Sequence, residues 1–264
     1  MKAPRANADA LQRLLDAGEK HLEDFLRLTA SVSHEHKGIR RSEMFFLYAS
    51  VVDRKFSRII ESGRARAQST LVLAKLFPAT TIISIESDAA SPDVAIAAER
   101  LKDCANVECR FGDSRVLLPQ LVARDDVVLI DGPKDFRAVK LALQLLRGGK
   151  PAAVFVHDLW LGSPARSFVD RSLRSALLSD HPEWVRRYCH LDGGDRFVPD
   201  SLGAQPFAYG ATMGRFEPIG DDYGRRLFES TIAQALARVR DNVAKITGRT
   251  PRRRPKDFEA VGAD

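Results

Sequence analysis

The stretch Ser57-Arg-Ile-Ile-Glu-Ser-Gly-Arg-Ala-Arg-Ala-Gln-Ser-Thr70 decides the fold. It starts as a short apolar run that ends at Glu61, turns at Gly63, and continues into residues 68–76, which are apolar at helical spacing. A strand, a glycine turn and a helix in succession open a βαβ unit. Gly63 allows a ligand to approach the backbone closely, and the next helix offers amide donors at its N-terminus. The stretch therefore predicts a site for a nucleotide-like ligand.

The same alternation continues along the chain. Further strands are predicted at 81–86, 107–111, 127–131 and 152–157, and helices at 92–102, 115–122, 136–146 and 163–178. Continuous apolar strands that alternate with helices predict a parallel sheet covered on both faces. Two more strands, at 184–191 and 207–216, have no helix between them. They predict an antiparallel hairpin that ends a seven-stranded, Rossmann-like sheet.

Helices are added at both ends of this sheet. Residues 6–30 and 42–53 predict two N-terminal helices, and residues 225–246 predict a C-terminal one. The domains are then an N-terminal helical extension and lid at 1–41, the sheet domain at 42–218, a C-terminal helix at 219–247 and a basic disordered tail at 248–264. Apolar residues of the last helix follow a 4-4-3-4-3 spacing and form a narrow seam, which indicates either docking on the domain or a dimer contact. The seam consists of Phe228, Ile232, Leu236, Val239, Val243 and Ile246.

Composition limits the class of protein. The chain has 264 residues, of which 44% are hydrophobic and 29% are charged, as in ordinary globular proteins. Its three cysteines show no metal-binding spacing, which favours a reducing compartment. No apolar run reaches the ~18 residues of a membrane span, and no signal peptide is recognised. We therefore expect a soluble, cytoplasmic protein.

A second acid supports the ligand site. Glu86 ends the strand 81–86, 23 residues after Gly63, and a carboxylate there can accept hydrogen bonds from both hydroxyls of a ribose. A dinucleotide-binding loop would read G-x-G-x-x-G, but Ala65 follows Gly63 and no glycine occupies the third position. NAD is therefore disfavoured, and an acid before the glycine, Glu61, favours S-adenosylmethionine.

These residues give the chain a resemblance to a known family. It resembles the class I S-adenosylmethionine-dependent methyltransferases, and within them the small-molecule O-methyltransferases of the catechol, caffeoyl-CoA and macrocin type. The matching residues are Lys37-Gly38, Glu61-x-Gly63 with Ser69, Ile85-Glu86, Gly112-Asp113-Ser114, Asp131-x-x-Lys134, Leu146-Arg-x-Gly149 and His157-Asp158. The resemblance spans about residues 37–160.

The resemblance implies roles for the residues around the cofactor. Glu61 and Gly63 would face the methionine part of S-adenosylmethionine, Glu86 would hold the ribose, and Asp113 and Ser114 would border the adenine. Lys37, Gly38 and Ser69 complete the predicted cofactor site. The chain departs from the family at Ala67, where a second glycine is usual, which puts the strength of cofactor binding in question.

A candidate catalytic cluster follows the fourth and fifth predicted strands. In the resembled family an acid and a pair of oxygen ligands at these places hold a divalent metal, so Asp131, His157 and Asp158 are the candidate ligands. Imidazole is a poor ligand for Mg²⁺, which leaves the identity of the metal open. In a metal-free mechanism, His157 or Lys134 would take the proton of the acceptor. A third interpretation is that Asp131 and Asp158 only cap helices.

The predicted reaction is methyl transfer to an oxygen of a small or glycan-like acceptor. Basic residues near the predicted cofactor site, such as Arg64 and Arg66, contribute to the net charge of +6 and favour an anionic acceptor. A non-catalytic methyltransferase-fold protein that binds or assembles with a partner is the first alternative, and an NAD-dependent oxidoreductase is the second. Nucleic acid is disfavoured because the aromatic residues do not interleave with basic ones.

Overall fold

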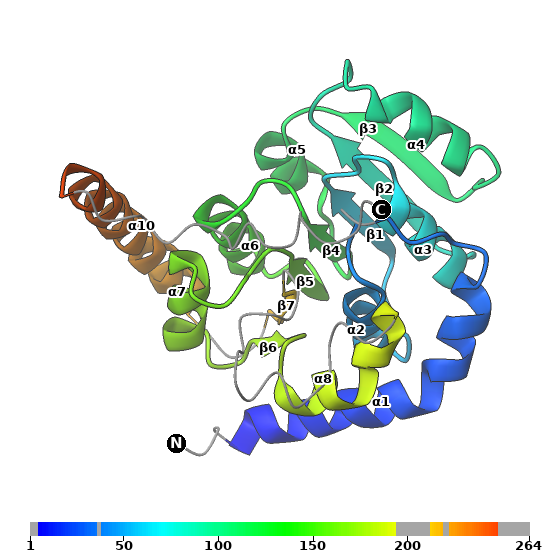
Figure 1. Ribbon diagram of the computed structural model, residues 1–264, viewed down its shortest axis with the longest axis horizontal. Coiled ribbons are helices and arrows are strands. Elements are labelled where there is room, and N and C mark those ends of the chain that lie inside the picture. The colour runs from blue at the N-terminus through cyan, green and yellow to red at the C-terminus, as the bar shows by residue number, and fades with distance from the viewer. Residues whose placement is uncertain (1–4, 36–37, 194–211, 219–221, 248–264) are drawn as a thin grey trace, which may run out of the picture.

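The computed structural model describes residues 5–35, 38–193, 212–218 and 222–247. The helices are α1 (Arg5–Thr29), α2 (Arg41–Val51), α3 (Gln68–Leu76), α4 (Asp93–Leu101), α5 (Ser114–Leu121), α6 (Phe136–Arg147), α7 (Pro164–Ser172), α8 (Pro182–Tyr188) and α10 (Tyr223–Ile246). The strands are β1 (Arg58–Ser62), β2 (Thr81–Glu86), β3 (Val107–Phe111), β4 (Val127–Ile130), β5 (Ala153–Val156), β6 (Leu177–Leu178) and β7 (Gly214–Phe216). Figure 1 shows the sheet at the centre of the molecule with helices on both sides.

The strand order of the sheet is β3-β2-β1-β4-β5-β7-β6. β1 to β5 pair in parallel, whereas β7 pairs antiparallel with both β5 and β6. The chain reverses its winding direction between β1 and β4, and in open α/β sheets ligands bind at such a switch point, outside the carboxyl ends of the strands. The sequence prediction of a seven-stranded, Rossmann-like methyltransferase sheet with an antiparallel end is therefore confirmed.

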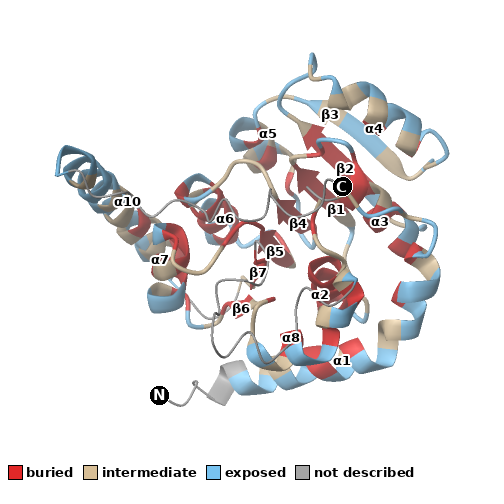
Figure 2. Cartoon of the chain, viewed as in Figure 1, coloured by how far each residue is buried: buried red, intermediate tan, exposed pale blue. Residues whose placement is uncertain are grey.

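Two hydrophobic cores cover the two faces of the sheet because successive residues of a strand point to opposite sides. Ile59 and Leu129 belong to the core under α1, α2, α3 and α8, whereas Ile60 and Val128 belong to the core under α6 and α7. The burial colours of Figure 2 follow this layering, with red in the central strands and in α2. Covered faces explain why these strands read as continuous apolar runs.

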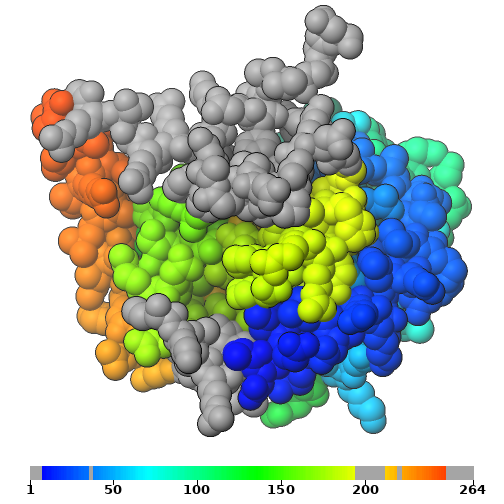
Figure 3. Space-filling view, turned by 60° about the horizontal axis from the view of Figure 1, so that its bottom comes forward, coloured from blue at the N-terminus to red at the C-terminus, as the bar shows by residue number. Residues whose placement is uncertain are grey.

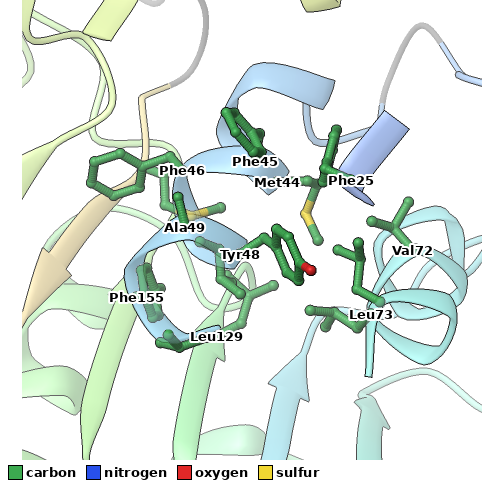
Figure 4. Packing of buried hydrophobic residues seen from close by; sticks show 14 of the residues in the cluster. Phe25, Met44, Phe45, Phe46, Tyr48, Ala49, Val72, Leu73, Leu129 and Phe155 are labelled. Carbon is green, nitrogen blue, oxygen red and sulfur yellow. The ribbon is translucent and has the colours of Figure 1, made fainter. Parts of the chain in front are cut away.

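Helix α2 is the most buried of the added helices, with every residue from Ser42 to Val51 buried. Its Phe46 lies edge-on against Phe155 of β5, with ring centroids 6.4 Å apart, and Phe45 packs on Phe25 of α1 at 4.9 Å. Figure 4 shows these rings together in one cluster above the sheet. The N-terminal helices are thus part of the core, and they bring α2 to the crevice.

Two sequence predictions at the end of the sheet are wrong, and a third is confirmed in part. The helix predicted at 163–178 ends at Ser172, after which Leu177–Leu178 form β6. The strand predicted at 184–191 is instead α8 followed by a 3₁₀ turn, Cys189–Asp192. Of the strand predicted at 207–216, Gly214–Phe216 form β7 and residues 207–211 lie outside the described part. The terminal antiparallel pair is therefore β6 with β7.

The error at α8 has a physical reason. Trp184, Val185 and Tyr188 are buried at helical spacing, but their side chains favour strands when the sequence is read locally. Pro182 occupies the first turn and the His181 ring accepts a hydrogen bond from the Glu183 N–H at 3.3 Å, so the helix has a defined start. Tertiary packing against α2 decides the helical state.

The C-terminal helix is present, but it does not dock through the predicted seam. Leu227, Ala233 and Ala237 pack on the core beneath α6 and α7, whereas the residues of the seam lie exposed on another side of α10. The basic tail at 248–264 lies outside the described residues. No helix in the described part is long and apolar enough to cross a membrane.

Candidate functional site

The turn between β1 and α3 lies against the turn after β4. Gly63 has a φ of +90°, and a Cβ added to it would lie 2.8 Å from the backbone nitrogen of Gly132. Its N–H donates to the carbonyl of Ile85 at 2.9 Å, which ties the turn to the end of β2. A side chain at Gly63 would therefore push apart the two loops that form the crevice.

We expect Gly63→Ala to lower the free energy of unfolding by about 2–4 kcal/mol, because it adds a backbone clash to the strain of a positive φ. Gly149→Ala is the matched control, since Gly149 also has a positive φ (+63°) but has open space at its Cβ position. That control should cost only about 1 kcal/mol. Denaturant unfolding of the two variants measures the difference, and equal losses would contradict the clash.

Ala67 stands at the start of α3 with a φ of +62°, which explains why a glycine is usual there. It is completely buried and packs with Ala97 and Leu101. The methyl group thus gains apolar contacts that offset part of the conformational strain. No side chain caps this helix end, so its first amide groups remain available as donors to an anionic group of a ligand.

Glu61 is enclosed rather than open to the crevice. Its carboxylate accepts hydrogen bonds from the hydroxyls of Ser69, Thr70 and Ser84, the last at 2.8 Å. Burial raises the pKa of Glu61 although these hydrogen bonds oppose the shift. In this arrangement Glu61 positions Ser69 at the N-terminus of α3, and any contact with a ligand's ammonium group would pass through such a neighbour or through water.

Glu86 lies at the end of β2, beside the Gly63 turn. Its Oε2 accepts from the N–H of Ala65 at 2.8 Å and its Oε1 from the N–H of Ser87 at 2.7 Å. Partial burial raises the pKa of Glu86, but the backbone N–H donors outweigh it and the net pKa is lowered. The side chain is therefore an ionised acceptor beside the Gly63 turn, as binding of two ribose hydroxyls requires.

The remaining predicted cofactor residues lie on different elements and differ in exposure. Asp113 caps α5 through the N–H of Arg115 and is exposed beyond the end of β3, while the neighbouring Ser114 is buried. Gly38 lies so close to the side-chain amide of Gln68 that a Cβ would overlap it. Lys37 lies outside the described residues. The loop before α2 is thus joined to the start of α3 through Gln68, a contact that sequence reasoning missed.

The candidate catalytic residues come together at the ends of β4 and β5. Lys134 Nζ lies 2.5 Å from Asp131 Oδ1 and 2.6 Å from Asp158 Oδ2, so that the ammonium bridges the two carboxylates. Burial lowers the pKa of Lys134, but the two carboxylates outweigh it and raise the pKa above its usual value. Lys134 is therefore an ammonium at neutral pH. Neither acid caps the next helix, because α7 is capped by Ser163 and no side chain caps α6.

His157 lies between two carboxylates, that of Asp131 from the bridge and that of Glu43. Its Nδ1 lies 2.7 Å from Asp131 Oδ1 and its Nε2 lies 3.2 Å from Glu43 Oε2. Burial lowers the pKa of His157, but Asp131 and Glu43 outweigh it and raise the pKa from 6.5 to about 10. The ring is then an imidazolium that donates from both nitrogens, and it supports Asp131 from below.

Glu43 is the member of the cluster that sequence reasoning missed. It comes from α2, is 1% exposed, and also accepts from the N–H of Arg40 at 3.2 Å. Its signal in the sequence is that it is the only charged residue in the buried stretch Ser42–Val51. The folding of α2 onto the sheet brings Glu43 into contact with His157, which lies 114 positions away in the sequence.

The donor set does not fit a divalent metal in this arrangement. Asp131, His157 and Asp158 offer ligand atoms within 4.8 Å of one another. However, the Lys134 ammonium lies between the two carboxylates, and an imidazolium has no lone pair to offer a metal. The cluster instead holds three carboxylates, an imidazolium and an ammonium, which nearly neutralise one another.

We expect Mg²⁺ and Mn²⁺ to leave the melting temperature of the chain unchanged. Lys134→Ala should create a site for these ions because it exposes two unbridged carboxylates, and millimolar ion should then raise the melting temperature. Lys140→Ala on α6, a lysine that donates to Gln234, is the control and should not respond. A clear response of the unmodified chain would favour the metal site that the resemblance implies.

Arg64 and Arg66, the basic residues predicted near the cofactor site, contact other groups of the protein. Arg64 is 3% exposed and donates to the carbonyls of Ser84 and Arg110. Arg66 lies 3.5 Å from Glu35. The structure thus gives both arginines contacts within the protein, and a role for them in binding an anionic acceptor stays a prediction.

A groove runs from the cluster to α10. It has a volume of about 1460 Å³ and is lined by Lys134, Asp158 and Trp160 at one end and by residues of α7 and α10 along its length. Its basic side chains are Lys134, Arg137, Arg171, Arg238 and Arg240, and its acidic ones are Asp135, Asp158 and Asp241. The described lining thus carries an excess of positive charge.

The comparisons with known proteins concern the fold alone. No family model and no curated protein matches the sequence. The structure is similar to the O-methyltransferase TomG from Streptomyces achromogenes in complex with SAM, at 21% identity over 82% of this chain and 91% of that chain, with a TM-score of 0.42. It is also similar to the SAH-bound methyltransferase PaMTH1 from Podospora anserina, at 17% identity over 81% and 97% of the two chains, with a TM-score of 0.42. These likenesses are distant, and the fold follows from the strand order of this chain itself.

Proposed function

We propose that the chain is an S-adenosylmethionine-dependent O-methyltransferase. The observation that carries the proposal is the meeting of two loops at the switch point of the sheet. The Gly63 turn and Glu86 lie at the carboxyl ends of β1 and β2, and the bridge of Asp131, Lys134 and Asp158 lies at the carboxyl ends of β4 and β5. A cofactor with a ribose and an acceptor with a hydroxyl would then lie side by side at the carboxyl edge of β1 and β4.

The residues of the crevice fit S-adenosylmethionine. Glu86 is an ionised acceptor placed for the ribose hydroxyls, and the uncapped start of α3 is placed for the carboxylate of the methionine part. Asp113 and Ser114 follow β3, where they would border the adenine. When bound, the cofactor supplies a methyl group on a positively charged sulfur that a nucleophilic oxygen can displace.

In the proposed mechanism, Lys134 is the group that contacts the acceptor oxygen. Its side chain is 45% exposed, whereas that of Asp158 is 11% and that of His157 is 9% exposed. The ammonium orients the hydroxyl and stabilises the negative charge that develops on its oxygen. The carboxylate of Asp158, which lies 2.6 Å from the Lys134 ammonium, would accept the hydroxyl proton. Asp131, supported by His157, keeps Lys134 in place.

The acceptor that we propose is a small or glycan-like molecule with an anionic group. Arg171, Arg238 and Arg240 line the groove, and no carboxylate of the described residues lies within ion-pair distance of them. Trp160 adds an aromatic surface near Lys134.

A homodimer also stays a proposal, since the seam of α10 is exposed.

Calorimetry with S-adenosylmethionine, S-adenosylhomocysteine and NAD tests this function. The proposal expects binding of both sulfur ligands and none of NAD. Binding of NAD alone would favour the oxidoreductase alternative. If neither sulfur ligand binds at high micromolar concentration, the methyltransferase proposal fails and a non-catalytic binding role becomes the better interpretation.

A further inference from the structure

Helix α10 carries a stripe of exposed apolar side chains. The stripe is defined by Phe228, Ile232, Leu236, Val239, Val243 and Ile246. These side chains are 47% to 84% exposed, and the other large hydrophobic residues that are exposed in the described part, Leu26, Phe111 and Val116, lie on separate elements. Contiguous apolar stripes of this kind mark interaction surfaces in proteins. In Figure 2 the outer half of α10 is coloured as exposed.

The stripe is not the surface by which α10 attaches to its own domain. A different side of the helix packs on α6 and α7, through Leu227, Ala233 and Ala237, and Lys140 donates to Gln234 at 3.2 Å. Figure 3 shows α10 as one edge of the molecule, with an open outer side. Leu236 and Val243 of the stripe also line the groove described above. Packing on α6 and α7 therefore accounts for the position of the helix but not for the exposure of the stripe.

We propose that the stripe binds the same stripe of a second copy of the chain, with the two helices antiparallel about a two-fold axis. The spacing of the stripe is 4-4-3-4-3, which is nearly the same when it is read in reverse. Reversal about the centre places Leu236 against Val239, Ile232 against Val243, and Phe228 against Ile246 of the partner copy. Such self-complementarity is the requirement for a two-fold interface, in which one patch contacts its own equivalent.

The size of the stripe fits a dimer. From Phe228 to Ile246 it is about 27 Å long at a rise of 1.5 Å per residue. With the exposed fractions of its six residues, the stripe has an exposed surface of roughly 600 Å² on each copy, so that complete pairing would remove at most roughly 1,200 Å² from water. This area reaches the lower end of the range for specific protein interfaces. The spacing of the stripe follows the period of a straight α-helix, so its side chains share one side of α10 along the whole length.

The oligomeric state of the full chain tests the proposal. Sedimentation velocity across a dilution series should show a dimer that dissociates on dilution, and the double variant Ile232→Glu with Val239→Glu should be a monomer at every concentration. Val116→Glu, the same kind of change at a residue 55% exposed on α5, is the control and should leave the dimer intact. A monomeric parent chain, or a dimer that survives the double variant, would overturn the proposal.

Disulfide crosslinking tests the antiparallel direction. Leu236→Cys chains mixed with Val239→Cys chains should form a crosslinked dimer under mild oxidation, more than either variant does alone. The unmodified chain, which has Cys104, Cys109 and Cys189, gives the background. If each variant crosslinks best with itself, the helices are parallel and the proposed antiparallel pairing is wrong.

Discussion

Replacement of Glu86 by alanine is expected to weaken binding of S-adenosylhomocysteine on the order of 100-fold. The carboxylate is ionised and half-buried, and under the proposed function it would accept two charge-assisted hydrogen bonds from the ribose. Such bonds contribute about 1.5 kcal/mol each, and a loss of about 3 kcal/mol corresponds to that factor. Calorimetry with the purified variant measures the change.

Two further variants separate the role of Glu86 in binding from its role in the fold. Glu86→Gln keeps one acceptor oxygen and should lose less affinity than Glu86→Ala. Glu108→Ala on β3 removes an exposed carboxylate that pairs with Arg110, and it should bind as the unmodified chain does. If Glu86→Ala folds and binds with unchanged affinity, the assignment of the ribose to this residue is incorrect.

The second large effect is expected at His157. His157→Leu should lower the free energy of unfolding by about 3–5 kcal/mol, because it leaves the buried carboxylate of Glu43 without its cation and removes one of the two cations beside Asp131. For a chain of this length the melting temperature should fall by roughly 10 °C. His21→Leu is the control, because His21 pairs with a half-exposed Asp53 at the surface and should contribute less than about 1 kcal/mol.

The same group predicts how stability depends on pH. The pKa of His157 is raised from 6.5 to about 10 in the folded chain, so its stabilising contribution is complete below pH 6.5 and disappears as the pH rises towards 10. The stability difference between the unmodified chain and His157→Leu should therefore shrink across that window. A difference that stays constant from neutral to alkaline pH would show that His157 is not held as an imidazolium.

Much of the fold could be predicted from the sequence because its information is local. Apolar runs and helical spacing place β1 to β5 and the helices between them within one or two residues, and Gly63 and Glu86 mark the ligand edge. The end of the sheet could not be predicted in the same way. β6 and β7 have two and three residues, too few for a periodic pattern, and α8 is helical because α2 lies against it.

The candidate site divides in a similar way. The sequence by itself determined which chemical groups follow β4 and β5, because Asp131, Lys134, His157 and Asp158 lie next to recognisable strands. Only the tertiary structure decided their charge states, since the pKa of a buried group depends on neighbours from distant parts of the chain. The arrival of Glu43 from α2 makes His157 an imidazolium, and the bridging of two carboxylates keeps Lys134 an ammonium. Likewise, the spacing of the last helix showed a seam, but only packing on α6 and α7 decided that this seam faces outward.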